Sequence, residues 1–122
     1  MSQGLKMFVM YVFYVLMVIF VSLLPSTGVS FWHVDKIGHF FAYAGMAVLA
    51  LLAFNSRISR ALALFFAVAL GAALEWGQSF VPGRDMSLMD GIANTLGVIT
   101  GTVLFWFRGQ HITRYVARFI GE

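Results

Sequence analysis

Residues 7–24 have the sequence MFVMYVFYVLMVIFVSLL, an apolar stretch without a single charged side chain. As a helix, these residues would extend about 27 Å at about 1.5 Å per residue, close to the roughly 30 Å hydrocarbon thickness of a bilayer. The stretch is too long for the apolar core of a typical signal peptide. A turn-forming cluster, PSTG at residues 25–28, follows it. We therefore expect a transmembrane helix here.

The rest of the chain continues this pattern. Hydrophobic residues make up 61% of the sequence and charged residues only 11%, whereas a soluble domain has about a quarter of its residues charged. Asp35 is a candidate N-cap for a second helix, and Ser87 with Asp90 resembles a capping box before a fourth. The sequence predicts one all-α domain over residues 1–122, an integral membrane bundle of four transmembrane helices at about 7–24, 35–54, 59–80 and 87–107.

Basic residues are distributed unevenly between the two sides of such a bundle. Two lie on one side, Lys36 and Arg84, and six on the other: Lys6, Arg57, Arg60, Arg108, Arg114 and Arg118. By the positive-inside rule, both termini are expected in the cytoplasm. The basic tail at residues 108–122 is either an amphipathic helix on the anionic inner leaflet or a frayed end.

Several function classes are disfavoured by composition. The chain has no cysteine, which excludes disulfides, thiolate metal sites and cysteine nucleophiles. Its net charge of +3 comes without a basic stripe or an aromatic RNA-binding motif, so no nucleic-acid partner is expected. Membrane lipids are the expected partners, and no cofactor is expected.

Polar side chains on three of the predicted helices reach one level of the membrane. Counted from the cytoplasmic helix ends at the rise of an α-helix, Glu75 and Asn94 each lie about 21 Å up, and His39 about 24 Å up. An unpaired charge at the bilayer centre costs about 2.5–3.5 kcal/mol, so these side chains should face one another. Small residues would allow the helices to approach closely: Gly71, Gly97 and Gly101.

Further polar residues extend this layer toward the non-cytoplasmic face. Lys36, His39 and Tyr43 share a face of the second helix, because they are three and four residues apart. The complete candidate ligand-binding set is Lys36, His39, Tyr43, Glu75, Gln78, Arg84, Asp90 and Asn94. Lys36 and Arg84 would supply positive charge for a phosphate, and the amides of Gln78 and Asn94 would supply hydrogen bonds.

The layer allows several functions. The favoured interpretation is a pocket that binds a lipid-linked or amphiphilic envelope component. An intramembrane enzyme would use Glu75 and His39 as catalytic base and acid, although no nucleophile motif supports it. A small oligomeric transporter would use the same pair as a proton relay. A structural subunit needs only interhelical hydrogen bonds. A metal site from His39, Glu75 and Asp90 lacks a close ligand-pair motif, so none is expected.

The same residues give the chain a family resemblance. The segments DKIGHFFAY at residues 35–43, EWGQ at 75–78, RD at 84–85 and DGIANTLG at 90–97 resemble the pattern of the VanZ-like membrane family. They cover the second, third and fourth predicted helices, in the order and spacing of the family. The matched positions include every member of the candidate ligand-binding set.

The resemblance implies a multi-pass protein of the bacterial inner membrane. The family's namesake is associated with low-level resistance to the glycopeptide teicoplanin, so a link to teicoplanin susceptibility is a further expectation. The resemblance does not supply a molecular mechanism, and function depends on sites rather than on folds.

Overall fold

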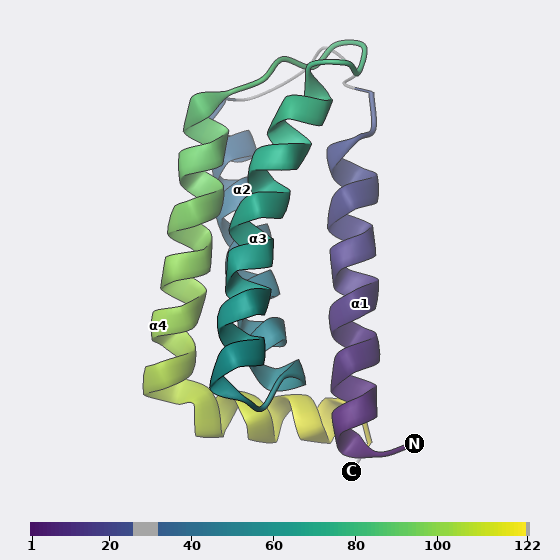
Figure 1. The fold of residues 1–122 in the computed structure, drawn as a ribbon, viewed down its shortest axis with the longest axis vertical. Coiled ribbons are helices and arrows are strands. Elements are labelled where there is room, and N and C mark those ends of the chain that lie inside the picture. The colour runs from purple at the N-terminus through teal and green to yellow at the C-terminus, as the bar shows by residue number, and fades with distance from the viewer. Residues whose placement is uncertain (26–31, 122) are drawn as a thin grey trace.

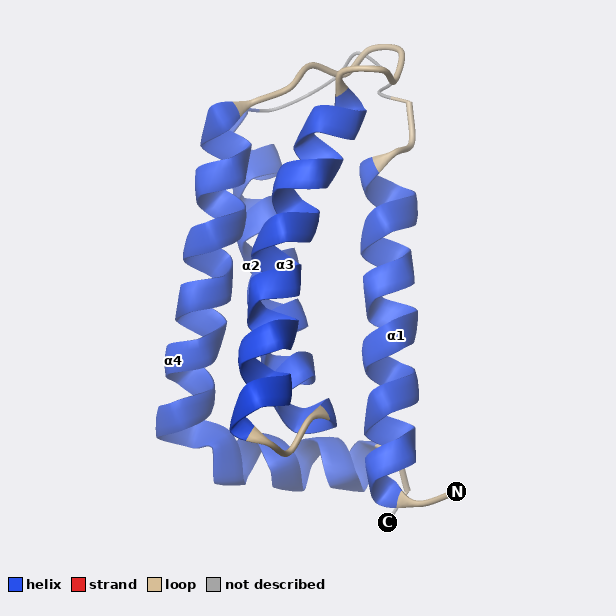
Figure 2. Cartoon of the chain, viewed as in Figure 1, coloured by secondary structure: helices blue, strands red, loops and turns tan. Residues whose placement is uncertain are grey.

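The computed structural model describes residues 1–25 and 32–121. In the described residues the chain forms four helices without a strand: α1 (Gln3–Ser22), α2 (Trp32–Ala53), α3 (Arg57–Gln78) and α4 (Leu88–Phe119). Each is long and apolar enough to cross a membrane. The short loop between α2 and α3 and the longer one between α3 and α4 lie at opposite ends of the bundle (Figure 2). The prediction of an all-α bundle with four membrane helices is confirmed; residues 26–28 of the predicted turn lie outside the described residues.

Three helices begin earlier than the apolar pattern predicts. The hydroxyl of Ser2 accepts a hydrogen bond from Leu5 N at 3.2 Å, and the hydroxyl of Ser56 accepts one from Ser59 N at 3.0 Å. These serine caps allow polar residues to form the first turns of α1 and α3. The third, α2, begins at Trp32, so Asp35 lies in its first turn, and the prediction that Asp35 is the N-cap was wrong.

The basic tail is a continuation of α4. The last part of this helix turns away from the bundle axis and runs across the base of the bundle toward the start of α1 (Figure 1). There, the Lys6 ammonium donates to the backbone carbonyl of Ile120 at 3.2 Å, and Ala117 is buried. The alternative of a frayed tail is therefore wrong for residues 108–119. Contact of the tail with lipid stays a prediction.

The closest packing is between α2 and α4. A side chain at Gly97 or Gly101 would collide with the backbone carbonyls of Phe40 and Ala44, respectively. These glycines therefore let the two backbones approach one another, as predicted. Gly71 of α3 also lies in close packing, against Tyr43 and Asn94.

The two ends of the bundle differ in chemistry. We call the end where α2 and α4 begin and α1 and α3 end the polar end. The opposite, basic end holds both termini (Figure 1), the arginines in the first turn of α3 and those of the tail. Between the ends, large apolar side chains such as Phe65 and Ile99 are exposed on the outside of the bundle, where a membrane protein contacts lipid.

Candidate functional site

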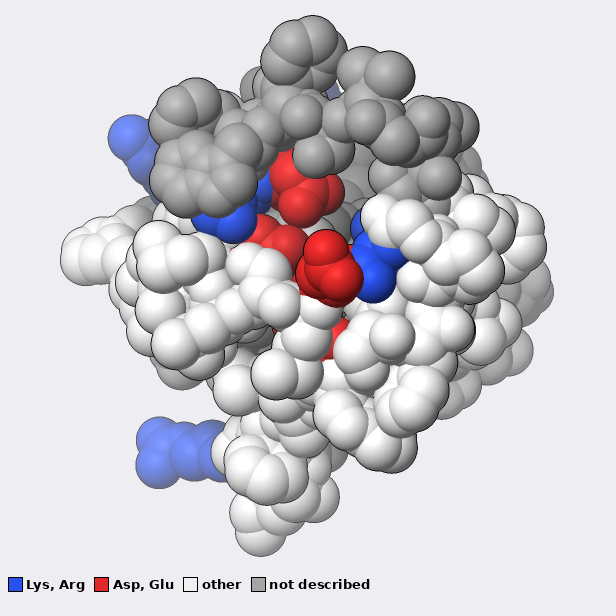
Figure 3. Space-filling model, turned by 90° about the horizontal axis from the view of Figure 1, so that it is seen from above, with Lys and Arg blue, Asp and Glu red and all other residues white. Residues whose placement is uncertain are grey.

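The polar end contains a cluster of charged side chains. Seen from this end, acidic and basic groups gather near the centre of the face, between uncharged residues (Figure 3). The ammonium of Lys36, from α2, lies 2.8 Å from Asp90 Oδ1, from α4. The side chain of Asp90 is 7% exposed and that of Lys36 is 16% exposed. This ion pair thus joins the first turns of two helices in a partly buried setting.

His39 lies one helical turn further into the bundle than Asp35. Its Nδ1 is 2.8 Å from Asn94 Oδ1. Because the amide oxygen of Asn94 can only accept a hydrogen bond, His39 Nδ1 is the donor. This bond fixes the orientation of the imidazole ring. The other nitrogen, Nε2, lies 3.6 Å from Asp90 Oδ2 and 3.8 Å from Asp35 Oδ1. Both distances exceed those of hydrogen bonds, so Nε2 faces two carboxylates without bonding to either.

Glu75 connects the end of α3 to the start of α4. Its buried carboxylate accepts a hydrogen bond from the backbone N–H of Ser87 at 3.0 Å, and its second oxygen lies 3.9 Å from His39 Nδ1. The Ser87 hydroxyl accepts from Asp90 N at 3.3 Å. The predicted capping box is therefore half correct. Ser87 caps the helix, but Glu75 makes the return bond expected of Asp90, whose carboxylate pairs with Lys36.

One group of possible metal ligands lies in the described residues. Ligand atoms of Asp35, His39 and Asp90 are all within 4.8 Å of one another. The group contains Asp35 in place of Glu75, which belonged to the trio considered from sequence. The Lys36 ammonium already lies against Asp90, so the protein itself supplies positive charge to this cluster.

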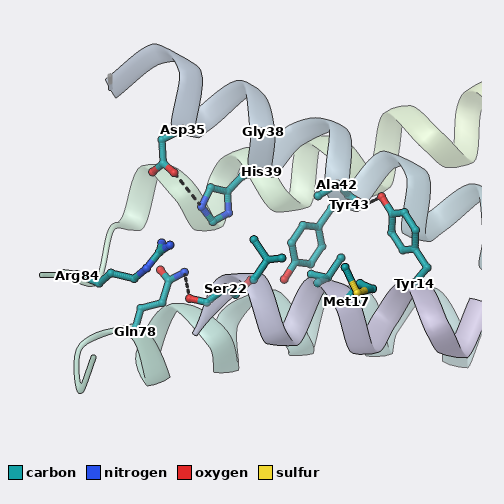
Figure 4. Close-up of a pocket in the computed structure, with 12 residues that line it drawn as sticks. Tyr14, Met17, Ser22, Asp35, Gly38, His39, Ala42, Tyr43, Gln78 and Arg84 are labelled. Atoms are coloured by element: carbon teal, nitrogen blue, oxygen red, sulfur yellow. Dashed lines mark hydrogen bonds and ion pairs between the residues drawn. The ribbon is translucent and has the colours of Figure 1, made fainter. Parts of the chain in front are cut away.

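A cavity of about 450 Å³ opens beside this cluster, between α1, α2 and α3 (Figure 4). Its polar lining comes from Ser22, Asp35, His39, Tyr43, Gln78 and Arg84. Its apolar lining includes Met17, Val18 and Val21 of α1 and Ala42 of α2. Charged groups thus lie toward the polar end, and apolar groups lie deeper along α1.

Hydrogen bonds from α3 and the loop after it hold the end of α1 against the cavity. The Gln78 amide donates to the carbonyl of Ser22 at 3.0 Å, and Arg84 Nε donates to the carbonyl of Leu24 at 2.6 Å. Deeper in the cavity, the Tyr14 hydroxyl donates to the carbonyl of Ala42 at 2.7 Å, which joins α1 to α2. These bonds explain why a uniformly apolar helix has a fixed place beside the site.

The family model described as VanZ/LLP1 matches residues 8–109. The chain belongs to this family. No curated protein and no solved structure matches the chain. The matched range contains the whole charged cluster and every residue that lines the cavity.

In this VanZ/LLP1 member, the eight predicted residues divide into two groups that share His39. The first is the cluster between α2, α3 and α4: Lys36, His39, Glu75, Asp90 and Asn94. The second lines the cavity: His39, Tyr43, Gln78 and Arg84. Lys36 does not line the cavity, although the sequence suggested that it and Arg84 serve one ligand. The structural role considered from the sequence, hydrogen bonding between helices, fits the first group, because its side chains bond to residues outside their own helix.

Some features of the VanZ/LLP1 site were missed from the sequence. The wall formed by α1 has no polar periodicity, and only tyrosines such as Tyr14 distinguish its inner face. The exposed Asp35 carboxylate lines the cavity, although the predicted ligand-binding set did not include it. The Ser87 amide carries no sequence signal, because every non-proline residue has the same backbone donor.

Proposed function

We propose that the cavity between α1, α2 and α3 binds a membrane amphiphile. The polar head would lie among Asp35, His39 and Arg84, and the chain would extend past Met17 and Val18. The observation that carries this proposal is the change in the cavity's lining from charged to apolar along the bundle axis. Ligand pockets combine a mainly apolar wall with a few polar groups that fix orientation, and this cavity follows that rule.

The polar lining suits a head with mixed chemistry. Arg84 bonds to Leu24 through Nε, so the planar guanidinium presents further donors suited to phosphate oxygens. The Asp35 carboxylate is 46% exposed and suits an amine or a hydroxyl. These groups favour a phosphorylated head that also carries a hydrogen-bond donor, which is the chemistry of many envelope lipids.

The location of the site follows from the charge distribution. Because the basic end is expected in the cytoplasm, the polar end would face the non-cytoplasmic side of the bacterial inner membrane. The amphiphile would then come from the outer leaflet, where lipid-linked envelope precursors are also found. If the amphiphile is such a precursor, its binding is a route by which this protein would affect teicoplanin susceptibility.

A second candidate function is an intramembrane enzyme acting on the same lipid. It is favoured by the fixed ring of His39, whose Nε2 has no hydrogen bond among the described residues and borders the cavity. A positioned imidazole is the commonest proton-transfer group in enzymes. Glu75, the base suggested by sequence, is instead bonded to Ser87. Incubation of the purified protein with inner-membrane lipids separates binding from turnover, because only an enzyme changes their masses.

Native mass spectrometry of protein released in mild detergent tests the binding proposal. Val18→Trp should fill the apolar part of the cavity and remove retained lipid. Leu16→Trp is the matched control, because Leu16 lies on the same helix, is 58% exposed and does not line the cavity. Lipid retained by the wild type and the control but lost from Val18→Trp supports the proposal. Equal retention by all three proteins would overturn it.

A further inference from the structure

The hydroxyl of Tyr43 faces the cavity and has no hydrogen-bond partner among the described residues; it is not one of the fully enclosed polar atoms. The residue is 2% exposed, and its hydroxyl makes no hydrogen bond with any residue that the structure describes. Figure 4 shows the ring extending from α2 into the cavity. A ligand that fills the cavity would remove water from this hydroxyl, and a buried hydroxyl is normally hydrogen-bonded. Tyr14, which lines the same cavity, follows this rule by donating to Ala42.

The position of Tyr43 indicates the depth in the cavity at which a ligand would need a hydrogen-bond acceptor. Asp35, His39 and Tyr43 follow at four-residue intervals on α2 and all line the cavity. Each interval corresponds to about 6 Å along the helix axis. Tyr43 therefore lies one turn deeper than His39, toward the part of the cavity lined by Met17 and Val18. A ligand that fills the cavity would therefore bind best with an acceptor placed below its charged head, at the depth of this hydroxyl.

We propose that the occupant is an ester-linked glycerophospholipid, with an ester carbonyl accepting a hydrogen bond from the Tyr43 hydroxyl. This inference rests on the proposed function. In such a lipid the ester carbonyls lie a few covalent bonds from the phosphate, between the head and the acyl chains. Arg84 would hold the phosphate near the polar end, while Asp35 would accept from the amine of an ethanolamine head.

This assignment distinguishes two classes of envelope lipid. A polyprenyl phosphate carries only hydrocarbon beyond its phosphate, so it would leave the Tyr43 hydroxyl unpaired in an apolar cavity. In a glycerophospholipid, an ester carbonyl would lie at the depth of the Tyr43 hydroxyl and would accept its hydrogen bond. The Tyr43 hydroxyl thus favours the glycerophospholipid over the polyprenyl carrier, although both have a phosphate that suits Arg84.

The test compares the affinity of three lipids for the purified full chain. They are diacyl phosphatidylethanolamine, its dialkyl ether analogue with the same head and chain lengths, and a polyprenyl phosphate. The wild type should bind the diacyl lipid about fivefold more tightly than the ether lipid, the ratio expected for one net hydrogen bond. Tyr43→Phe should remove this preference. Tyr14→Phe should keep it, because the Tyr14 hydroxyl already bonds to Ala42.

The outcomes separate this inference from the proposed function. Equal binding of the ester and ether lipids by the wild type, or tighter binding of the polyprenyl phosphate, would overturn the glycerophospholipid assignment and leave an amphiphile site in place. An ester preference that persists in Tyr43→Phe would likewise overturn the assignment of an ester carbonyl to Tyr43 and leave the amphiphile site in place. Binding of none of the three lipids would overturn both proposals. If Tyr43→Phe fails to fold, the ester-to-ether ratio of the wild type decides the inference alone.

Discussion

The carboxylate of Glu75 accepts a hydrogen bond from the backbone N–H of Ser87 at 3.0 Å, so the last turn of α3 holds the residue that caps α4. The carboxylate is buried, and the first backbone donors of a helix have no partner within the helix itself. A charged acceptor near the start of a helix also interacts favourably with the helix dipole. This bond therefore ties the end of the loop that carries Arg84 to the last turn of α3.

Replacing Glu75 should affect stability according to whether an acceptor oxygen remains. Glu75→Ala leaves the Ser87 N–H without its partner and should lower the free energy of unfolding by about 1–3 kcal/mol. Glu75→Gln keeps an amide oxygen in place and should cost clearly less. Thermal unfolding in one detergent compares the variants with the wild type. Identical melting temperatures for the Ala and Gln variants would show that the bond does not hold α4.

The ion pair between Lys36 and Asp90 predicts strong coupling between these two positions. Lys36→Met or Asp90→Asn alone leaves one charged group in a partly buried setting without its counterion, which is more costly than removing both. The double variant should therefore be more stable than the sum of the single changes predicts, by about 0.5–3 kcal/mol. A double-mutant cycle on the free energies of unfolding measures this coupling. Additive single effects would contradict it.

The convergence of His39, Glu75 and Asn94 could be predicted because helical rise and span ends determine depth in a membrane. Counting from the cytoplasmic helix ends placed the three side chains at a similar level. In the structure His39 bonds to Asn94 and lies near Glu75. The ligand-binding role of these residues stays a prediction.

Other parts of the site depend on contacts that residue spacing does not encode. The partner of Glu75 is a backbone amide in a loop, and its choice depends on how that loop folds. Lys36 and His39 share a helix face by spacing, yet Lys36 reaches Asp90 outside the cavity, whereas His39 borders it. The place of α1 depends on single bonds such as the one from Tyr14 to Ala42. A uniformly apolar sequence cannot indicate which face makes them.

The contact between α2 and α4 makes glycine essential at Gly97 but not at Gly91. Gly97→Ala would push a methyl group into the backbone carbonyl of Phe40 and should cost about 1–3 kcal/mol of stability, since the helices must separate. Gly91→Ala on the same helix meets no atom within 4 Å and should stabilise the protein by about 0.5–1 kcal/mol. Unfolding of both variants under identical detergent conditions tests this contrast. A Gly97→Ala protein as stable as Gly91→Ala would show that the helices are not in close contact there.

The absence of cysteine from the sequence allows a direct test of membrane orientation. Asn55 and Asp85 are both exposed, in the connections at the basic end and the polar end, respectively. By the positive-inside rule, Asp85→Cys should react with a membrane-impermeant thiol reagent on spheroplasts, while Asn55→Cys should react only after the membrane is permeabilised.

The opposite labelling pattern would place the charged cluster and the cavity mouth on the cytoplasmic side. Lipids of the inner leaflet would then be the accessible ligands, and the proposed link with teicoplanin, which acts outside this membrane, would be lost. The contacts of Tyr43 and Arg84 would keep their chemistry, because they depend on the lining of the cavity and not on its orientation. Orientation therefore decides which leaflet supplies the amphiphile, whereas the lipid-binding comparison decides which amphiphile it is.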